Sequence, residues 1–483
     1  MPLSWIAPER IAPAMTRNAA AARALAYFDE GGFVADLRRR VAVASESQRP
    51  EGRPFLFSYL TDEIGPALAA LGFSWRIADD SPAGAPPFLI GARIEDPALP
   101  TVLVYGHGDV VNGQAELWRE GLAPWTLTAE GDRLYGRGTA DNKGQHTVNL
   151  GALAAVLAAR NGRLGFNLKA VFESGEECGS PGLREFCAAH AAELAADVLI
   201  ASDGPRMSAE RPTVFLGSRG SFTFDLSLDL RKGSHHSGNW GGALCNPASV
   251  LAHAVAGMIG ADGRILVAGL RPPAIPEAVR KALGDITLGG GPGDPAIERT
   301  WGEPGLSPEE RVFAWNTLEV LSFHAGGDPP ANAIPGTARA RLQLRYVKGC
   351  DPATFLPAIR AHLDAGGFSR VALAPARAAG SFAATRLDPE NPWVGWTLAS
   401  IARTTGKRPA LLPNLGGSIP NDAFALVLGL PTIWIPHSYP SCAQHAPDEH
   451  LLVSVAREAL AIMAGLFWDL GEGGTPTRKD AQS

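Results

Sequence analysis

The chain has 483 residues, of which 46% are hydrophobic and 19% charged, so it is long enough for two domains that each bury their own core. Its formal net charge is −6, its pI is near 6.0, and it has no run rich in Lys or Arg, which argues against a nucleic-acid partner. The amino terminus lacks the basic start and apolar stretch of a secretory signal, and no run of about 18 apolar residues suggests a membrane span. We therefore expect a cytoplasmic protein that does not insert into a membrane.

Apolar, strand-like runs alternate with alanine-rich helical stretches through the first two hundred residues. We expect strands at 101–107, 166–173 and 197–203, separated by helices at 149–160 and 182–196. Strands that alternate with helices in this way form a mostly parallel sheet with helices on both faces. The pattern predicts an α/β fold.

The pattern changes after the first two hundred residues. Residues 221–230 and 337–347 alternate apolar and polar side chains with a period of two, which is typical of strands in a sheet with one solvated face. The α/β pattern returns afterwards and continues to a helix over 454–470. We predict a main α/β domain in two parts, 1–216 and 386–483, with a second, α+β domain of 217–385 inserted between them.

Histidine and carboxylate side chains follow several of the predicted strands. They are His107 and Asp109 in VYGHGDVV, Asp141 in LYGRGTADNKGQH, Glu173, Glu176 and Glu177 in VFESGEECGS, and Asp203 in VLIASDGP. An isolated Glu-Glu pair is ordinarily a solvated turn, but sites in open α/β sheets form outside the carboxyl ends of the strands. We expect these groups to meet at one edge of the sheet.

Charge repulsion limits how such carboxylates can meet. Each pair of like charges ~4 Å apart costs about 4 kcal/mol at an effective dielectric constant of 20. Several such pairs rival the whole stability of a domain, which is roughly 5–15 kcal/mol. Either the carboxylates do not converge or divalent cations neutralise them, and two such cations balance four carboxylates. A late segment adds His437, His445 and His450, of which His445, in a loop before the last helix, is placed to reach this edge.

Other kinds of site fit the sequence less well. The G-x-G before Asp141 does not suit a dinucleotide, because Asp141 stands at the third glycine position and would repel a pyrophosphate. The segment LGSRG around Ser218 does not fit the G-x-S-x-G motif of a nucleophilic serine, because leucine stands at the first glycine position. The five cysteines are scattered without C-x-x-C spacing, which argues against a disulfide framework, and nothing in the sequence marks Cys442 as a reactive thiol.

Six motifs in this order carry a resemblance to a known family: G-H-G-D-V-V, G-R-G-T-A-D-N-K-G, S-G-E-E-C-G-S, A-S-D-G-P, H-S-G-N-W-G-G and Q-H-A-P-D-E. Between about residues 90 and 460 the chain resembles the dinuclear-zinc metallopeptidases. That family includes aminoacylase, acetylornithine deacetylase, glutamate carboxypeptidase and carnosinase.

The resemblance implies a site with two metal ions. His107 and Asp203 would bind one ion, Glu177 and His445 would bind the other, and Asp141 would bridge them. We expect two divalent cations, zinc in the first place, with manganese and cobalt as alternatives that His and carboxylate ligands also accept.

The resemblance also implies catalytic roles. Glu176 would be the general base that acts on a water molecule between the metal ions, and Asp109 would orient His107. The peptide bond between Asp141 and Asn142 would be cis. Glu173 receives no role.

The inserted segment, 217–385, resembles the family's lid and dimerisation domain. His236 would stabilise the oxyanion and, as in dimeric members, act on the metal site of the neighbouring subunit of a homodimer. Arg345, with Asn332 nearby, would hold the substrate carboxylate. Gly417 and Ser418 would contact the substrate backbone.

Aspartate at position 203 and the large lid resemble the carnosinase-like dipeptidases. We therefore expect a metal-dependent hydrolase of dipeptides or similar small peptides. The alternative is an amidohydrolase that acts on N-acyl amino acids or other small amides. A more remote alternative is a non-catalytic peptide-binding protein, which would ordinarily have lost the base or a metal ligand.

Overall fold

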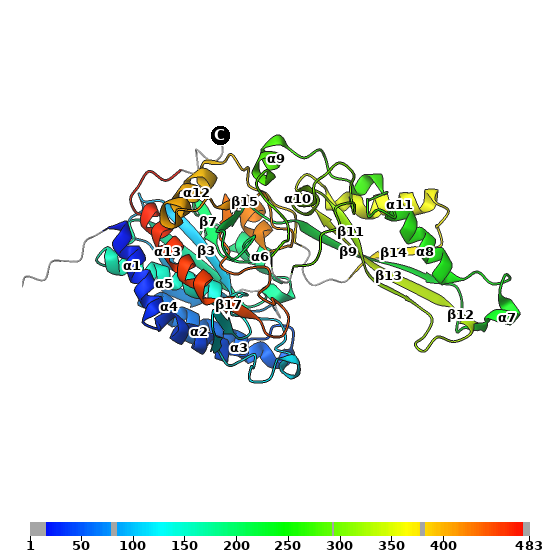
Figure 1. Cartoon of the computed structure of the whole chain (residues 1–483), viewed down its shortest axis with the longest axis horizontal. Coiled ribbons are helices and arrows are strands. Elements are labelled where there is room, and N and C mark those ends of the chain that lie inside the picture. Colours follow the sequence, from blue (N-terminus) through cyan, green and yellow to red (C-terminus); the bar gives the residue numbers. More distant parts are fainter. Residues whose placement is uncertain (1–15, 79–84, 292–293, 377–381, 477–483) are drawn as a thin grey trace, which may run out of the picture.

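Figure 1 shows the computed structural model, which describes residues 16–78, 85–291, 294–376 and 382–476. A broad body built on a large sheet joins a narrower, elongated body that carries α8, α11 and strands β9, β11 and β13. The division of the chain into domains at 1–216, 217–385 and 386–483 stays a prediction.

The large sheet has eight strands in the order β1-β2-β6-β3-β7-β16-β8-β15. Its strands are β1 (Ser74–Ile77), β2 (Phe88–Arg93), β3 (Thr101–His107), β6 (Asn167–Glu173), β7 (Val198–Ala201), β8 (Thr213–Phe215), β15 (Ala410–Leu412) and β16 (Thr432–Trp434). β3 pairs in parallel with β6 and β7, and β16 pairs in parallel with β7, whereas β1 and β2 form an antiparallel edge. The mostly parallel sheet confirms the predicted fold class.

Two apolar cores cover the two faces of this sheet. Along β3 the side chains alternate: Val102 and Val104 join the core beneath α1, α5 and α13, while Leu103 and Tyr105 join the core beneath α6. The helices of this body are α1 (Arg17–Asp29), α2 (Gly32–Ala42), α3 (Arg53–Ser58), α4 (Gly65–Ala70), α5 (Lys143–Ala159), α6 (Leu183–Ala189), α12 (Pro392–Thr405) and α13 (Val453–Leu470).

Two helices differ in length from the prediction. α5 begins at Lys143, six residues earlier than expected, because the polar start of this helix is buried beside the site and hides the apolar periodicity. α6 ends at Ala189, and the rest of the predicted helix forms turns that lead into β7. A small sheet of β4 (Thr128–Glu130), β5 (Arg133–Tyr135) and β17 (His450–Leu452) lies beside this body.

The inserted segment forms an antiparallel four-stranded sheet in the order β11-β13-β9-β14. Leu342 and Leu344 of β13 are buried against the helices on one face, and Arg341 and Arg345 alternate with them on the other, as the period of two predicts. The elements are β9 (Gly220–Asp229), β10 (His235–His236), α7 (Ser237–Trp240), α8 (Pro247–Met258), α9 (Glu277–Leu283), α10 (Pro308–Phe313), β11 (Thr317–Ala325), β12 (Ala333–Ile334), β13 (Thr337–Tyr346), α11 (Phe355–Ala365) and β14 (Ala372–Pro375).

The two ends of the inserted segment run side by side. Thr385 N donates to Ser218 O, and Leu387 N donates to Leu216 O, so the outgoing and returning segments hydrogen-bond to each other. Gly217 has φ 150°, and a Cβ there would lie 2.3 Å from Thr385 O, so this close approach needs glycine.

Within the described ranges, each helix is too short or too polar to cross a lipid bilayer. The five cysteines are all free thiols.

Candidate metal centre

The first group of potential ligands lies at the carboxyl ends of β3 and β7. His107 is the last residue of β3, and Asp203 follows β7 by two residues. His107 Nε2 lies 3.0 Å from Asp141 Oδ1 and 3.8 Å from Asp203 Oδ2. All three side chains are buried, and each offers a donor atom within 4.8 Å of the others.

The second group shares Asp141 with the first. His445 Nε2 lies 3.0 Å from Asp141 Oδ2 and 3.1 Å from Glu177 Oε2, and these donor atoms again lie within 4.8 Å of one another. The two oxygens of Asp141 therefore face different histidines. Imidazole nitrogens and carboxylate oxygens, in two groups joined by one carboxylate, suit a pair of divalent cations.

Burial and crowding shift the acid–base properties of this cluster. Burial raises the pKa of Glu177 to about 7 and that of Asp203 to about 6, and the charge of Asp141 adds to both shifts. Burial alone would also raise the pKa of Asp141, but hydrogen bonds from His107 and His445 hold it far below its usual value. Burial would lower the pKa of His445, yet its contacts with Asp141 and Glu177 raise it to about 11. Asp141 is thus held as an anion by its contacts with the two histidines.

The loop that carries Asp141 is held by Glu449, a residue that the sequence analysis left without a role. This buried carboxylate accepts hydrogen bonds from the backbone N–H groups of Gly138 (3.1 Å), Ala140 (2.9 Å) and Asp141 (3.1 Å), and from Arg137 Nη1 (2.8 Å). Its place as the last residue of the motif Q-H-A-P-D-E was the signal in the sequence. Glu449 therefore fixes the backbone that presents the shared carboxylate.

The peptide bond between Asp141 and Asn142 is cis, as the resemblance implied. Asn142 Nδ2 donates to Ser202 O at 2.8 Å, which ties this bond to the segment before Asp203.

Asp109 contacts both His107 and the turn that carries the two glutamates. Its oxygens accept hydrogen bonds from the N–H groups of Glu176 (3.1 Å) and Glu177 (3.0 Å). His107 Nδ1 lies 3.1 Å from the Asp109 carbonyl oxygen and 3.4 Å from its carboxylate. Asp109 thus positions His107 largely through its backbone, and its carboxylate also anchors Glu176 and Glu177.

Glu176 borders a pocket of about 380 Å³ together with three of the metal-ligand candidates, Asp141, Asp203 and His445. The residues that line it are Asp141, Glu176, Asp203, Gly204, Pro205, Arg345, Leu415, Gly417, Ser418, Ile419, Gln444 and His445. Burial raises the pKa of Glu176 well above its usual value; the charge of His107 works against this shift, and the nearby acids add to it. A carboxyl group of this kind suits proton transfer near neutral pH.

The same pocket is also lined by Arg345 of the inserted body and by the segment 415–419 of the main body. Arg345 Nη1 donates to Ser418 Oγ at 2.7 Å, and that hydroxyl donates to Arg219 O at 2.6 Å. Gly417 also lines the pocket. The predicted substrate-binding residues Arg345, Gly417 and Ser418 therefore lie together, in the same pocket as Asp141, Asp203 and His445.

His236 and Asn332 lie elsewhere. His236 is exposed and belongs to β10, which pairs with β12, and Asn332 O accepts from Ser237 N at 3.2 Å. These elements form the far tip of the inserted body, at the opposite end of the molecule from β3 and β7 (Figure 1). The expectation that Asn332 lies near Arg345 is wrong within one chain, because the ten residues of β13 separate them by roughly 30 Å at 3.3 Å per residue.

The other polar residues that the sequence analysis singled out are buried or bonded to neighbouring side chains. His437 is buried against Ser202 Oγ (2.9 Å), and His450 contacts Tyr439 OH (2.6 Å). Burial raises the pKa of the Cys442 thiol to about 12, which argues against a nucleophile there. Glu173 is fully buried and accepts hydrogen bonds from Tyr105 OH and Ser180 Oγ, both at 2.8 Å.

This chain is similar to known proteins in sequence and in fold. Beta-Ala-His dipeptidase of Rattus norvegicus is 27% identical over 352 residues, which cover 69% of this chain and 71% of that protein. A Cys-Gly metallodipeptidase of Schizosaccharomyces pombe is 30% identical over 362 residues, covering 68% and 72%. The crystal structure of human carnosine dipeptidase 1 superposes with a TM-score of 0.75 at 22% identity, over 94% of this chain and 99% of that one, and shows the same fold.

The family model described as peptidase family M20/M25/M40 matches residues 103–469, a segment that includes all six motifs. The chain belongs to peptidase family M20/M25/M40.

Proposed function

We propose that this protein is a metal-dependent dipeptidase. The observation that carries the proposal is the single pocket in which Asp141, shared by two ligand groups, and Glu176 face Arg345. The dipeptidase relatives support dipeptides as the substrate class and make an N-acyl amino acid hydrolase the less favoured alternative. We further propose a cytoplasmic location, in keeping with the five free thiols.

His107, Asp141 and Asp203 would hold one divalent cation, and Asp141, Glu177 and His445 would hold the other, with zinc as the first candidate. Bound cations would supply Lewis-acid chemistry, lowering the pKa of a coordinated water and polarising a carbonyl oxygen. Glu176 would take a proton from the attacking water and return it to the departing amine, a transfer suited to its raised pKa. Asp109 would hold Glu176 and Glu177 in a fixed position relative to His107.

Arg345 would bind the α-carboxylate of the substrate, because its partly buried guanidinium lines the pocket and its only hydrogen bond to another described residue is to the neutral Ser418 hydroxyl. A guanidinium–carboxylate contact is charge-assisted and can be bidentate. Gly417 and Ser418 would border the substrate backbone.

We also propose that the active unit is a homodimer in which His236 and Asn332 of each subunit complete the site of the other. Both lie on the far tip of the inserted body, too distant to serve their own chain. Strand β11 is the edge of its sheet and exposes Val320 (42%), Leu321 (53%) and Phe323 (41%). An apolar, unpaired edge of this kind favours association with a second copy.

The proposed activity is tested by a hydrolysis screen of dipeptides and matched N-acyl amino acids with the protein loaded with zinc, manganese or cobalt in turn. We expect dipeptides to be cleaved, activity to vanish with a chelator and to return when metal is restored. Faster cleavage of N-acyl amino acids would favour the amidohydrolase instead. Metal binding without hydrolysis of either class would identify a binding protein.

Glu176→Gln removes the proton acceptor while keeping the shape of the side chain. We expect kcat to fall by roughly 10²–10⁴-fold, because general bases contribute that much. Metal analysis should still find two ions per chain, since Glu176 is a base and not a ligand in this proposal. A variant that loses a metal ion, or keeps more than about 1% of the activity, contradicts the assigned role.

Glu449→Gln tests how the loop before Asp141 is held. An amide has one acceptor oxygen in place of the two that bind three N–H groups and Arg137, so the loop loses support. We expect metal affinity to fall by about 10–100-fold in a competition titration with a chelating dye, because groups that orient ligands have effects of that size. Glu130→Gln, at an exposed carboxylate paired with Arg119, is the matched control. Unchanged affinity would show that Glu449 does not support the site.

The shared site of the dimer is tested by complementation between two inactive variants. His236→Ala and Glu176→Gln should each be nearly inactive alone. When equal amounts are co-assembled, half of the dimers are mixed and each mixed dimer has one intact site, so about a quarter of normal activity should return. If subunit exchange is demonstrated by mass spectrometry and no activity returns, His236 does not act across the dimer.

A further inference from the structure

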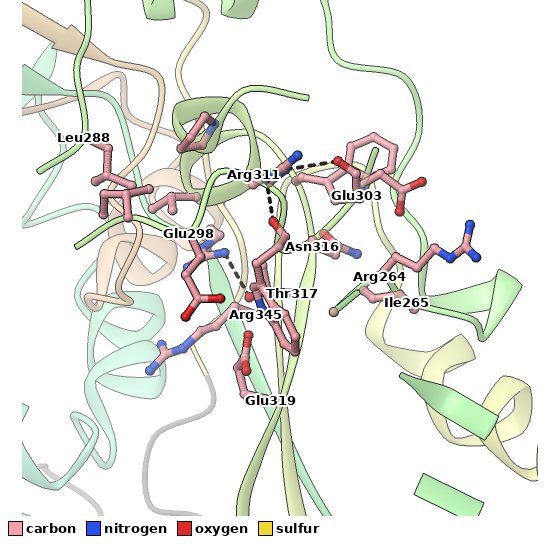
Figure 2. Close-up of a pocket in the computed structure, with 18 of the residues that line it drawn as sticks. Arg264, Ile265, Leu288, Glu298, Glu303, Arg311, Asn316, Thr317, Glu319 and Arg345 are labelled. Atoms are coloured by element: carbon pink, nitrogen blue, oxygen red, sulfur yellow. Dashed lines mark hydrogen bonds between the residues drawn. The ribbon is translucent and has the colours of Figure 1, made fainter. Parts of the chain in front are cut away.

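A second, larger cavity of about 600 Å³ adjoins the proposed catalytic pocket (Figure 2). It lies over the open face of the inserted sheet, where Thr317, Glu319, Gln343 and Arg345 point, and the segment 296–303 closes it from above. Arg345 lines both this cavity and the catalytic pocket. A group bound at Arg345 can therefore extend into the cavity.

Arg219 gives this cavity a second buried guanidinium beside that of Arg345. Its Nε donates to Gly416 O at 2.7 Å and its Nη1 donates to Thr317 Oγ1 at 3.2 Å, both uncharged acceptors. Across the described part of the chain, neither Arg219 nor Arg345 has a carboxylate within ion-pair distance. Burial lowers the pKa of Arg219 to about 9, the like charge of Arg345 adds to the shift, and Glu319 opposes it. The guanidinium stays charged near neutral pH, and it forms no ion pair with an acid among the described residues.

A third donor in the lining of this cavity has no partner among the described residues. Trp315 Nε1 is buried without a hydrogen-bond acceptor in that part of the chain, and Trp315 lines the cavity. A buried N–H group without a partner costs about 1–3 kcal/mol, so an acceptor on a bound molecule would relieve it.

The other charged groups of the cavity are arranged differently. Arg311 donates to the carbonyl oxygens of Glu303, Arg299 and Trp301, so it serves to hold the covering segment. Arg264 pairs with Asp262, and its guanidinium points away from the cavity in Figure 2. Glu303 lies at the end away from Arg345 in the same view. Glu298 and Glu319 lie at the Arg345 end in that view, and among the described residues neither forms an ion pair with Arg219 or Arg345. This end therefore holds two guanidinium groups whose hydrogen bonds go to uncharged acceptors, with two glutamates farther than ion-pair distance.

We propose that this cavity is the subsite for the side chain of the substrate's carboxyl-terminal residue, and that Arg219 and Trp315 select a side chain that carries a carboxylate. This proposal rests on the proposed dipeptidase function. With the α-carboxylate at Arg345, the side chain of a carboxyl-terminal glutamate extends toward Arg219 and the indole N–H. A second anion there satisfies donors that the protein itself leaves without an acidic partner.

The test compares kcat/KM for Ala-Glu and Ala-Gln, which differ in side-chain charge and hardly in size. We expect the wild-type protein to favour Ala-Glu by about tenfold or more, because a hydrogen bond to a charged group contributes that much. Arg219→Gln should bring this ratio close to one, chiefly through KM for Ala-Glu. Trp315→Phe, which removes only the indole N–H donor and some ring area, should lower the ratio by a smaller factor.

Arg264→Gln is the matched control, since this arginine borders the same cavity with its charge directed elsewhere, and its Glu-to-Gln ratio should equal that of wild type. A purely structural role of Arg219 would reduce cleavage of both dipeptides equally and leave the ratio unchanged, which would overturn the proposal. So would a wild-type ratio near one, or a preference for Ala-Trp over Ala-Glu. If no dipeptide is cleaved with any metal, the proposed dipeptidase function fails, which is a different result from cleavage without this preference.

Discussion

The carboxylate of Asp141 is the contact on which the rest of the site depends. Each of its oxygens faces a different histidine, so it joins two ligand groups that come from distant parts of the chain. It remains an anion in a buried position because positive groups surround it. The carboxyl ends of β3 and β7 bring His107 and Asp203 to it, and the loop before the last helix brings His445.

The buried acids around this contact serve different purposes. Asp141, Glu177 and Asp203 direct their oxygens toward the cluster, whereas Asp109 and Glu449 accept hydrogen bonds from backbone N–H groups of the segments that carry the ligands. A carboxylate that accepts hydrogen bonds from several N–H groups can fix a loop that contains no helix or strand. Supporting acids of this kind let irregular segments hold side chains at defined distances.

Much of the fold followed from periodicity in the sequence. The alternation of strands and helices predicted the mostly parallel sheet, and the period of two predicted β9 and β13 with their solvated face. The start of α5 was missed because a buried polar helix has no apolar stripe.

The gathering of His107, Asp141 and Asp203 could be anticipated because strand ends of a parallel sheet share an edge. The part played by Glu449 could not, because its partners are backbone groups some three hundred residues earlier, and backbone hydrogen bonds leave no pattern of residue types. Asn332 and Arg345 are close in the sequence, but the extended strand β13 separates them in space. Closeness of two motifs in the sequence therefore did not predict their distance.

The paired connections at 216–218 and 385–387 have a mechanical consequence. Two strands of backbone that hydrogen-bond to each other resist twisting far more than a single linker does, yet they can still bend together. The bodies are also joined by packing, because Val279 of α9 and Phe313 of α10 belong to the apolar core that contains Trp434 of β16. Rotation of one body against the other would therefore have to disrupt both the paired backbone and this shared core. The fold thus acts as a brace that fixes the distance across the pocket between Arg345 and Asp141.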